Sequence, residues 1–341
     1  MGALAVGSIV DVVLLSFLVI VALAIVQMKD LLAVIMLTGI YGLLSASFFV
    51  TMDAVDVAFT EASVGAGIAT LLMLITITMT GRAESPQRHK PLLALFVVSV
   101  TGCLLIYGTL DMPYFGSADA PIHHHVAPRY IQDSMQEVGV INIVTSVLAS
   151  YRGFDTFGEA IVIFTAGIAV ISLLSVVYCK ETLKEFERVN RSLHDQHLIL
   201  RVAIKILIPF ILLFALYVQF HGDYGPGGGF QAGVIFSAGI ILYSMLFGLS
   251  AARRIISHSI IKITAALGVL LYGSVGIVSF IKGGNFLDYS VLATNPIAGQ
   301  HLGILLIEFG VGCTVASVML IIFYNFADRS ELGQNKEKGS V

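Results

Sequence analysis

Three glutamates stand inside or at the edge of long apolar segments, where an ionisable side chain is costly to bury. Glu61 and Glu308 lie inside such segments, and Glu159 opens another. A carboxylate in the middle of a membrane span costs about 2.5 to 3.5 kcal/mol on insertion scales, so such acids usually face a cavity or a partner. Each glutamate is therefore a candidate for a proton or cation relay. For Glu61 the alternative is a protonated side chain that bonds a neighbouring helix and only fixes packing.

A histidine precedes Glu308 by seven residues, which is two turns of an α-helix. His301 and Glu308 would therefore share one helix face. Because histidine titrates near neutral pH, a histidine near the surface and a glutamate deeper in the span could pass protons along this face. The alternative is that His301 only marks the boundary between membrane and water.

A group of charged residues precedes and opens one span. Arg152, Asp155 and Glu159 recur at spacings of three and four residues. If this segment is helical, they form one charged stripe where the chain enters the membrane. Asp155 could equally cap the helix by accepting hydrogen bonds from free backbone N–H groups. Capping with a local salt bridge accounts for the pattern, so the residues alone favour this simpler interpretation.

A glycine-rich segment between two spans is the most unusual backbone feature. Its three successive glycines after a proline are a poor helix start, and they allow positive φ angles or a close backbone approach. We expect a turn that dips into the membrane face and whose free N–H groups meet an anion or a partner loop. The lysine and the serine or threonine of a phosphate loop are missing. The residues of interest are His221, Pro226, Gly227, Gly228, Gly229, Phe230 and Gly233.

The elements that must position these residues are membrane-spanning helices. Of the 341 residues, 57% are hydrophobic and 12% are charged, against roughly 25% charged in soluble proteins. These proportions exclude a soluble protein with a single core and predict an all-α polytopic membrane protein. Nine apolar runs are long enough to span a bilayer, namely residues 8–27, 31–51, 54–80, 92–110, 158–179, 200–220, 229–250, 259–281 and 299–324.

Nothing in the sequence suggests a cofactor, a metal site or nucleic-acid binding. The net charge is −3, and the three cysteines, Cys103, Cys179 and Cys313, lie far apart. Iron–sulfur and zinc sites need paired spacings that these cysteines lack. The three adjacent histidines, residues 123–125, cannot all face one ion, so we expect a solvated loop there.

The basic residues predict the orientation, because positively charged loops stay in the cytoplasm. With the N-terminus outside and the C-terminus inside, all of the nineteen Lys and Arg residues except Arg129, Arg152 and Lys282 fall on the inner side. All three glutamates then lie in the outer halves of their spans. A tenth apolar segment, Met135 to Ala149, is short and carries Glu137, which predicts an amphipathic helix outside the bilayer.

Charged connections divide the chain into three blocks. The first block, residues 1–81, carries three spans, and the second, residues 82–180, carries two spans with a long outer loop. Residues 181–199 are a charged cytoplasmic linker. The third block, residues 200–327, carries four spans, and residues 328–341 are expected to be a disordered cytoplasmic tail.

With these motifs the chain resembles the MnhB/MrpB subunit of the multisubunit Mrp-type Na⁺/H⁺ antiporters. In this chain the MnhB-like part is fused to N-terminal modules similar to the C-terminal end of the large MrpA subunit. The third block is similar to MnhB through His221, the run Pro226 to Phe230, Gly233, His301, Gly303, Glu308, Gly310 and Gly312. The first block resembles a small membrane-bound hydrogenase protein, MbhD, through Asp56 to Ala58, Thr60 to Ala62 and Val64 to Gly67. The second block resembles the adjoining MbhE module through Arg152 to Thr156, Gly158 and Glu159.

The resemblance implies a multi-pass protein of the bacterial inner (plasma) membrane that works with large antiporter-like subunits and several small membrane subunits. It implies Na⁺ and H⁺ as the ions, and an ion path that uses Asp56, Glu61, Arg152, Asp155, Glu159, His301 and Glu308. The glycine-rich turn would serve structure and subunit contacts. Two alternatives stay open: a membrane component of an ion-pumping redox complex such as a membrane-bound hydrogenase, and a purely structural component. The sequence does not say which cation is exchanged.

Overall fold

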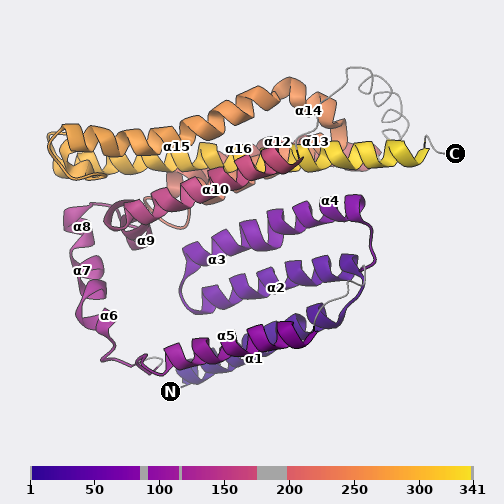
Figure 1. Ribbon diagram of the computed structural model, residues 1–341. Helices are drawn as coiled ribbons and strands as arrows, with labels where there is room; N and C mark the ends of the chain where they lie inside the picture. Colours follow the sequence, from indigo (N-terminus) through magenta and orange to yellow (C-terminus); the bar gives the residue numbers. More distant parts are fainter. Residues whose placement is uncertain (1, 85–90, 115–116, 175–197, 339–341) are drawn as a thin grey trace.

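The computed structural model describes residues 2–84, 91–114, 117–174 and 198–338, and within them every regular element is a helix. Nine helical segments of this part are long and apolar enough to cross a membrane, which confirms the predicted number of spans. The spans run roughly antiparallel through the molecule (Figure 1). The fifth span begins at Gly153, five residues before the predicted start. The linker 181–199 lies outside the described residues except for its last two.

The first block forms three antiparallel spans. They are α1 (Gly2–Gln27), α2 (Leu31–Thr51), and a third span built from α3 (Val55–Glu61), the π-helix η1 (Ala62–Ala69) and α4 (Thr70–Thr80). Asp30 caps α2 by accepting a hydrogen bond of 2.9 Å from the N–H of Leu32. The π-helix begins directly after Glu61, and such segments are often found at functional sites.

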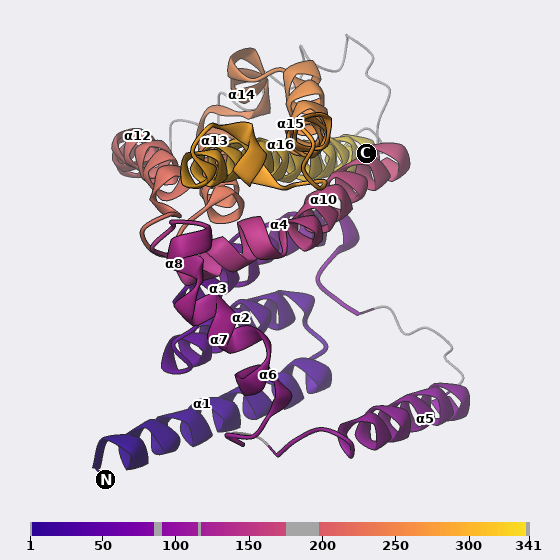
Figure 2. The same ribbon diagram turned by 90° about the vertical axis from the view of Figure 1, so that its left-hand side faces the viewer.

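The second block contains two spans joined by short helices at one end of the molecule (Figure 1). Its elements are α5 (Pro91–Thr109), α6 (Pro121–His124), α7 (Val126–Gln132), α8 (Ser134–Glu137), α9 (Ile143–Thr145), the π-helix η2 (Ser146–Tyr151) and α10 (Gly153–Leu174). Figure 2 shows α5 set apart from the other helices. In contrast, α10 packs on the third block.

The predicted amphipathic helix from Met135 to Ala149 is not continuous. The chain leaves α8 through Gly139, whose φ of 81° an L side chain rarely adopts, and a new helix starts after Asn142. The side chains of Val138 and Val140, on either side of Gly139, are both buried, so this break is held in the protein. This break is what brings Asn142 next to the third block, as described below.

The third block surrounds one long helix. Its elements are α12 (Leu198–His221), α13 (Gly229–Phe247), α14 (Leu249–Ile255), α15 (His258–Ile281), the 3₁₀ helix η3 (Tyr289–Leu292) and α16 (Pro296–Lys338). Helices α13, α15, α10 and α4 all pack against α16. The expected disordered tail is therefore wrong for residues 328–338, because α16 continues through them. The buried Asp328 forms an ion pair with Arg253 of α14, which holds this part of the helix in the protein.

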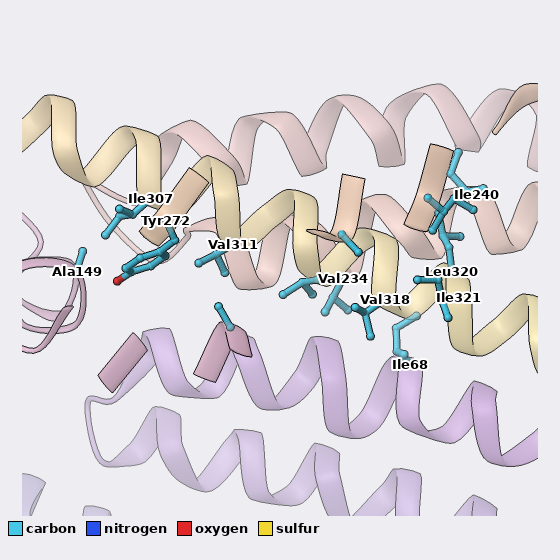
Figure 3. Close-up of a cluster of buried hydrophobic side chains, with 14 of the residues drawn as sticks. Ile68, Ala149, Val234, Ile240, Tyr272, Ile307, Val311, Val318, Leu320 and Ile321 are labelled. Atoms are coloured by element: carbon cyan, nitrogen blue, oxygen red, sulfur yellow. The ribbon is translucent and has the colours of Figure 1, made fainter. Parts of the chain in front are cut away.

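The core lies along α16 and draws side chains from all three blocks. Figure 3 shows Ile68 of η1, Ala149 of η2 and Val234 of α13 beside residues of α16. The bilayer supplies little hydrophobic driving force between helices, so close van der Waals packing of small residues matters most. Gly229 is the tightest point, because a Cβ there would overlap the backbone carbonyl oxygen of Glu308. The glycine thus permits α13 to touch the backbone of α16.

We expect Gly229→Ala to destabilise the protein by about 1 to 3 kcal/mol, because the added methyl group forces α13 away from α16. The thermal midpoint of the purified protein should fall accordingly. The matched control is Gly108→Ala in α5, where a Cβ meets nothing within 4 Å among the described residues. Equal thermal midpoints for the two variants would contradict the close contact.

Candidate functional site

All three blocks contribute walls to one cavity of about 260 Å³. It lies at the end of the helix bundle that carries the glycine-rich turn, residues 221–228, hereafter the glycine turn. Three carboxylates line it, one from each block: Asp56 of α3, Glu159 of α10 and Glu308 of α16. The remaining wall is formed by Val57, Thr60, Val144, Thr145, Leu148, Ala149, Thr156, Gly227, Gly228, Gly229, Phe230, Gln231, Tyr272, Ile307 and Val311.

The glycine turn forms one side of the cavity and lies directly against Glu308. The turn folds back on α12, where the N–H of Gly228 donates a hydrogen bond of 3.1 Å to the carbonyl of Val218. Gly228 has a φ of 117°, which L side chains rarely adopt. A Cβ on Gly222 or Gly228 would lie 3.1 or 3.3 Å from a carboxylate oxygen of Glu308. Side chains at these positions would therefore crowd the carboxylate.

Glu308 itself has no hydrogen bond or ion pair with any residue that the structure describes. The charged groups near enough to influence it are Asp223 of the glycine turn and Asp56 of α3, and both are acidic. Nearby, Gln231 donates a hydrogen bond of 2.8 Å to the hydroxyl of Thr60, which joins α13 to α3. The cavity therefore holds a carboxylate whose oxygens are available to a proton, a water molecule or a cation.

The structure places His301 and Glu308 beside the same glycine turn. Nδ1 of His301 lies 3.2 Å from a carboxylate oxygen of Asp223, and these two side chains are 42% and 25% exposed. Asp223 thus contacts His301 and lies near enough to Glu308 for its charge to influence that carboxylate. No pattern in the sequence singled out Asp223, because an acid is unremarkable in a predicted outer loop.

Glu61 does not join the other carboxylates. Its side chain turns toward α2, where a Cβ on Gly42 would lie 3.3 Å from Oε1. The side chains of Asp56 and Thr60, on the same helix, line the cavity. Glu61 is half-buried and has no hydrogen bond or ion pair to the described residues. It therefore forms a separate position, next to the start of the π-helix.

The predicted charged stripe of the fifth span divides into two parts. Nε and Nη2 of Arg152 lie 2.6 and 2.5 Å from a carboxylate oxygen of Asp155. Asp155 is in the first turn of α10 and makes an ion pair rather than the capping contact that the residues alone favoured. Glu159 faces the cavity instead, beside Thr156. The ion pair is half exposed, with 61% and 51% of the two side chains accessible.

His221, Tyr217 and Pro226 lie outside the cavity wall, whereas Phe230 is part of it. His221 stacks on Tyr217, with ring centroids 4.8 Å apart. Its backbone carbonyl accepts hydrogen bonds from the N–H groups of Tyr224 and Gly225, which close the turn. Pro226 lines a separate groove between α12 and the first block, and Gly233 lies against the backbone of Gly312. These positions support the packing of the turn and do not face Glu308.

Three side chains of the second block that lie outside the spans, those of Arg129, Glu137 and Tyr151, form a cluster. The carboxylate of Glu137 accepts hydrogen bonds from the Tyr151 hydroxyl and from Arg129, the latter at 3.1 Å. The hydrogen bond from Tyr151 and then that from Arg129 hold the pKa of Glu137 below its usual value. Burial and the same contact raise the pKa of Tyr151. This cluster ties α7 and α8 to the end of η2.

Sequence reasoning missed several polar residues that join the blocks at the cavity. The hydroxyl of Thr145 donates a hydrogen bond of 2.6 Å to the carbonyl of Gly222, and the amide of Asn142 reaches the same turn. The hydroxyl of Tyr272 donates a hydrogen bond of 2.7 Å to the carbonyl of Gly153 at the start of α10. Only Asn142 had a local signal, since asparagine before an apolar run is a common helix cap.

Comparison with known proteins decides the family. Residues 199–321 match the model described as a domain related to the MnhB subunit of Na⁺/H⁺ antiporter. Residues 16–82 and 99–185 match MbhD and MbhE, the models of the D and E subunits of MBH. Over 128 residues the chain is 33% identical to the Na⁺/H⁺ antiporter B subunit of Bacillus subtilis and covers 89% of that protein. The chain belongs to the MnhB family of Mrp-type Na⁺/H⁺ antiporter proteins.

Other relatives extend beyond the MnhB region and match nearly the whole chain. The MnhB-family chain is 26% identical over 330 residues to the probable K⁺/H⁺ antiporter A/B subunit of Rhizobium meliloti, a match that covers 88% of this chain and 32% of the relative. It superimposes on the Mrp complex from Dietzia sp. DQ12-45-1b with a TM-score of 0.72 and 27% identity, over 92% of this chain and 34% of that chain. The chain thus spans about a third of the length of both.

With cation/proton antiport as the activity proposed below, we expect Asp155→Asn and Asp155→Ser to shift its pH profile while the protein still assembles, because both variants leave Arg152 without its charged partner near the cavity. The measurement is proton movement driven by added cation in membrane vesicles, across pH. Asp30→Asn is the matched control, since Asp30 pairs with Arg82 at 3.4 Å with similar exposure at the opposite end of the bundle. Wild-type profiles for both Asp155 variants would leave a purely structural role for this residue.

Proposed function

We propose that this chain is a membrane component of a cation/proton antiporter of several subunits and that the carboxylates of its cavity form part of the ion path. The observation that carries the proposal is the meeting of Asp56, Glu159 and Glu308, from three blocks far apart in the sequence, around one cavity. Acids placed inside a membrane protein usually serve ions or protons. The family relationship points in the same direction.

The arrangement of charges supports exchange between a proton and a cation. Like charges in a low-dielectric cavity disfavour the simultaneous ionisation of all three acids. A proton or a monovalent cation relieves the same repulsion, so the two compete for the same negative site. Competition for one site is the simplest physical basis for exchange. The route from outside would lead from His301 through Asp223 to Glu308, with Asp56 and Glu159 on the facing walls.

The distribution of basic residues predicts that this cavity lies in the outer half of the plasma membrane. In that orientation the carboxylates serve the outer arm of the path, where the cation leaves or the proton enters.

The chain would act with large antiporter-like subunits, because its relative named A/B is about three times as long. Relatives named for Na⁺ and for K⁺ both exist, so the exchanged cation is a monovalent alkali ion. No enzymatic step or bound cofactor is part of this proposal.

We expect Glu308→Gln to lower antiport in vesicles by about tenfold or more while leaving the complex assembled, since glutamine keeps size and hydrogen bonding but cannot release a proton. Glu84→Gln is the control, because Glu84 is exposed and lies outside the cavity. Co-purification of partner subunits establishes assembly. Wild-type antiport by an assembled Glu308→Gln complex would reject the ion path through this cavity.

We also expect Glu61→Gln to lower antiport without loss of assembly, for the same chemical reason. Because Glu61 faces α2 and not the cavity, its effect should combine with that of Glu308→Gln without strong coupling. The double variant, assayed in the same vesicles, measures this coupling. Normal antiport by the Glu61→Gln complex would leave Glu61 as a packing residue.

A membrane component of an ion-pumping redox complex is the second candidate. Two of the three family models that match are MbhD and MbhE of MBH, which favours this candidate for the first two blocks. The protein composition of the gently purified complex separates the two functions. Antiporter-like subunits alone support antiport, whereas co-purified redox subunits would support the alternative.

A further inference from the structure

One side chain of the second block contacts both of the other blocks at the edge of the cavity. Nδ2 of Asn142 lies 3.2 Å from the carbonyl oxygen of Gly222 and 3.0 Å from that of Gly225, both in the glycine turn. The same nitrogen lies 3.4 Å from Oδ1 of Asp56 in the first block. The backbone N–H of Asn142 also donates a hydrogen bond of 3.1 Å to the carbonyl of Asp223.

The oxygen and the nitrogen of the Asn142 side-chain amide make different contacts. Oδ1 of Asn142 accepts a hydrogen bond of 3.0 Å from the N–H of Val144 and so caps α9. Nδ2 carries two hydrogens, which the two turn carbonyls can occupy, and Asp56 lies at a longer distance. A cap needs only the oxygen. The contacts of the nitrogen therefore exceed what local helix formation requires.

Asp56 receives a second contact from the turn that Asn142 holds. The N–H of Gly227 lies 3.4 Å from the same Oδ1, so both donors approach one oxygen of the carboxylate. No contact of the other oxygen is found among the described residues. Asn142 thus contacts both Asp56 and the turn that donates to Asp56, and it shares the hold on the turn with Thr145 and Val218.

We propose that Asn142 is a positioning residue of the ion path. It fixes the glycine turn against Glu308 and holds Asp56 on the opposite wall of the cavity. The inference rests on the proposed function only for its effect on transport, because the contacts themselves are independent of it. The helix break after α8 and the half-buried side chain of Asn142 fit this role, since they bring one amide within reach of two other blocks.

The expected effect on pH dependence follows from the groups around Asp56. Glu308 of α16 and Glu159 of α10 line the same cavity as Asp56, and Asp223 of the glycine turn, paired with His301, influences Glu308. Most of them are acidic. Loss of the two N–H donors would leave Asp56 among like charges and free to move relative to Glu308.

Asn142→Asp is the decisive variant. Aspartate is isosteric and caps helices about as well as asparagine, so it preserves the contact with Val144. It removes both hydrogens of Nδ2 and adds a negative charge beside Asp56. Asn295→Asp is the matched control, because Oδ1 of Asn295 accepts the same kind of capping hydrogen bond, 3.0 Å from the N–H of Ile297. If the aspartate variant does not assemble, Asn142→Ser takes its place in the test, because serine can still cap the helix but lacks the Nδ2 donor.

Two measurements on the whole complex separate the position of the turn from its role in transport. The first is chymotrypsin cleavage after Tyr224, whose side chain is 68% exposed but whose backbone is held in the turn. Release of the turn should speed this cleavage by about tenfold, as expected for the loss of hydrogen bonds to two carbonyls. The second is the pH profile of antiport in vesicles, which a cap alone would not change.

The proposal expects faster cleavage and a shifted pH profile for Asn142→Asp or Asn142→Ser, and neither change for Asn295→Asp. Wild-type cleavage and a wild-type profile would overturn it and leave Asn142 as a cap. Faster cleavage with an unchanged profile would support the hold on the turn and contradict the ion path through Asp56. A shifted profile with wild-type cleavage would overturn the positioning of the turn.

Discussion

The close contact between the backbones of α13 and α16 is the constraint on which the rest of the structure depends. At Gly229 no side chain separates the two helices, and the carbonyl of Glu308 lies where a Cβ would be. Because α13 begins at this contact, the glycine turn before it is drawn over the Glu308 side chain. The turn then offers its carbonyls to Asn142 and Thr145 and an N–H to Asp56. The cavity is thus a consequence of one backbone approach.

The cavity joins three blocks that match three different family models. Each block contributes one carboxylate, and none of the blocks encloses the cavity alone. Many of the polar contacts between blocks are hydrogen bonds to backbone carbonyls and hydroxyls, such as Tyr272 to Gly153 and Gln231 to Thr60. Such contacts satisfy the backbone without adding charge where water is scarce. The carboxylates therefore remain the dominant charges of the cavity.

Outside the cavity, two of the ion pairs lie near the ends of the spans. Asp30 pairs with Arg82 near the ends of α2 and α4, and Asp328 pairs with Arg253 beside α14. Paired charges at these places stabilise the ends of the helices without affecting the middle of the bundle. Glu308 and Glu61, in contrast, have no partner of opposite charge among the described residues. This difference separates charges that support the fold from charges available to an ion.

The sequence by itself determined the number of spans, the turn at residues 221–228 and the identity of the unusual acids, because hydropathy, glycine and charge act locally. It also placed His301 and Glu308 on one face, which helix geometry alone requires. Only the tertiary structure decided that Asp56 and Glu159 share a cavity with Glu308 and that Glu61 does not. It also decided the break of the helix predicted over residues 135–149 and the helical continuation past Asp328. Several of these features depend on contacts between residues far apart in the sequence, such as Asn142 with Gly222 and Arg253 with Asp328, which no local pattern encodes.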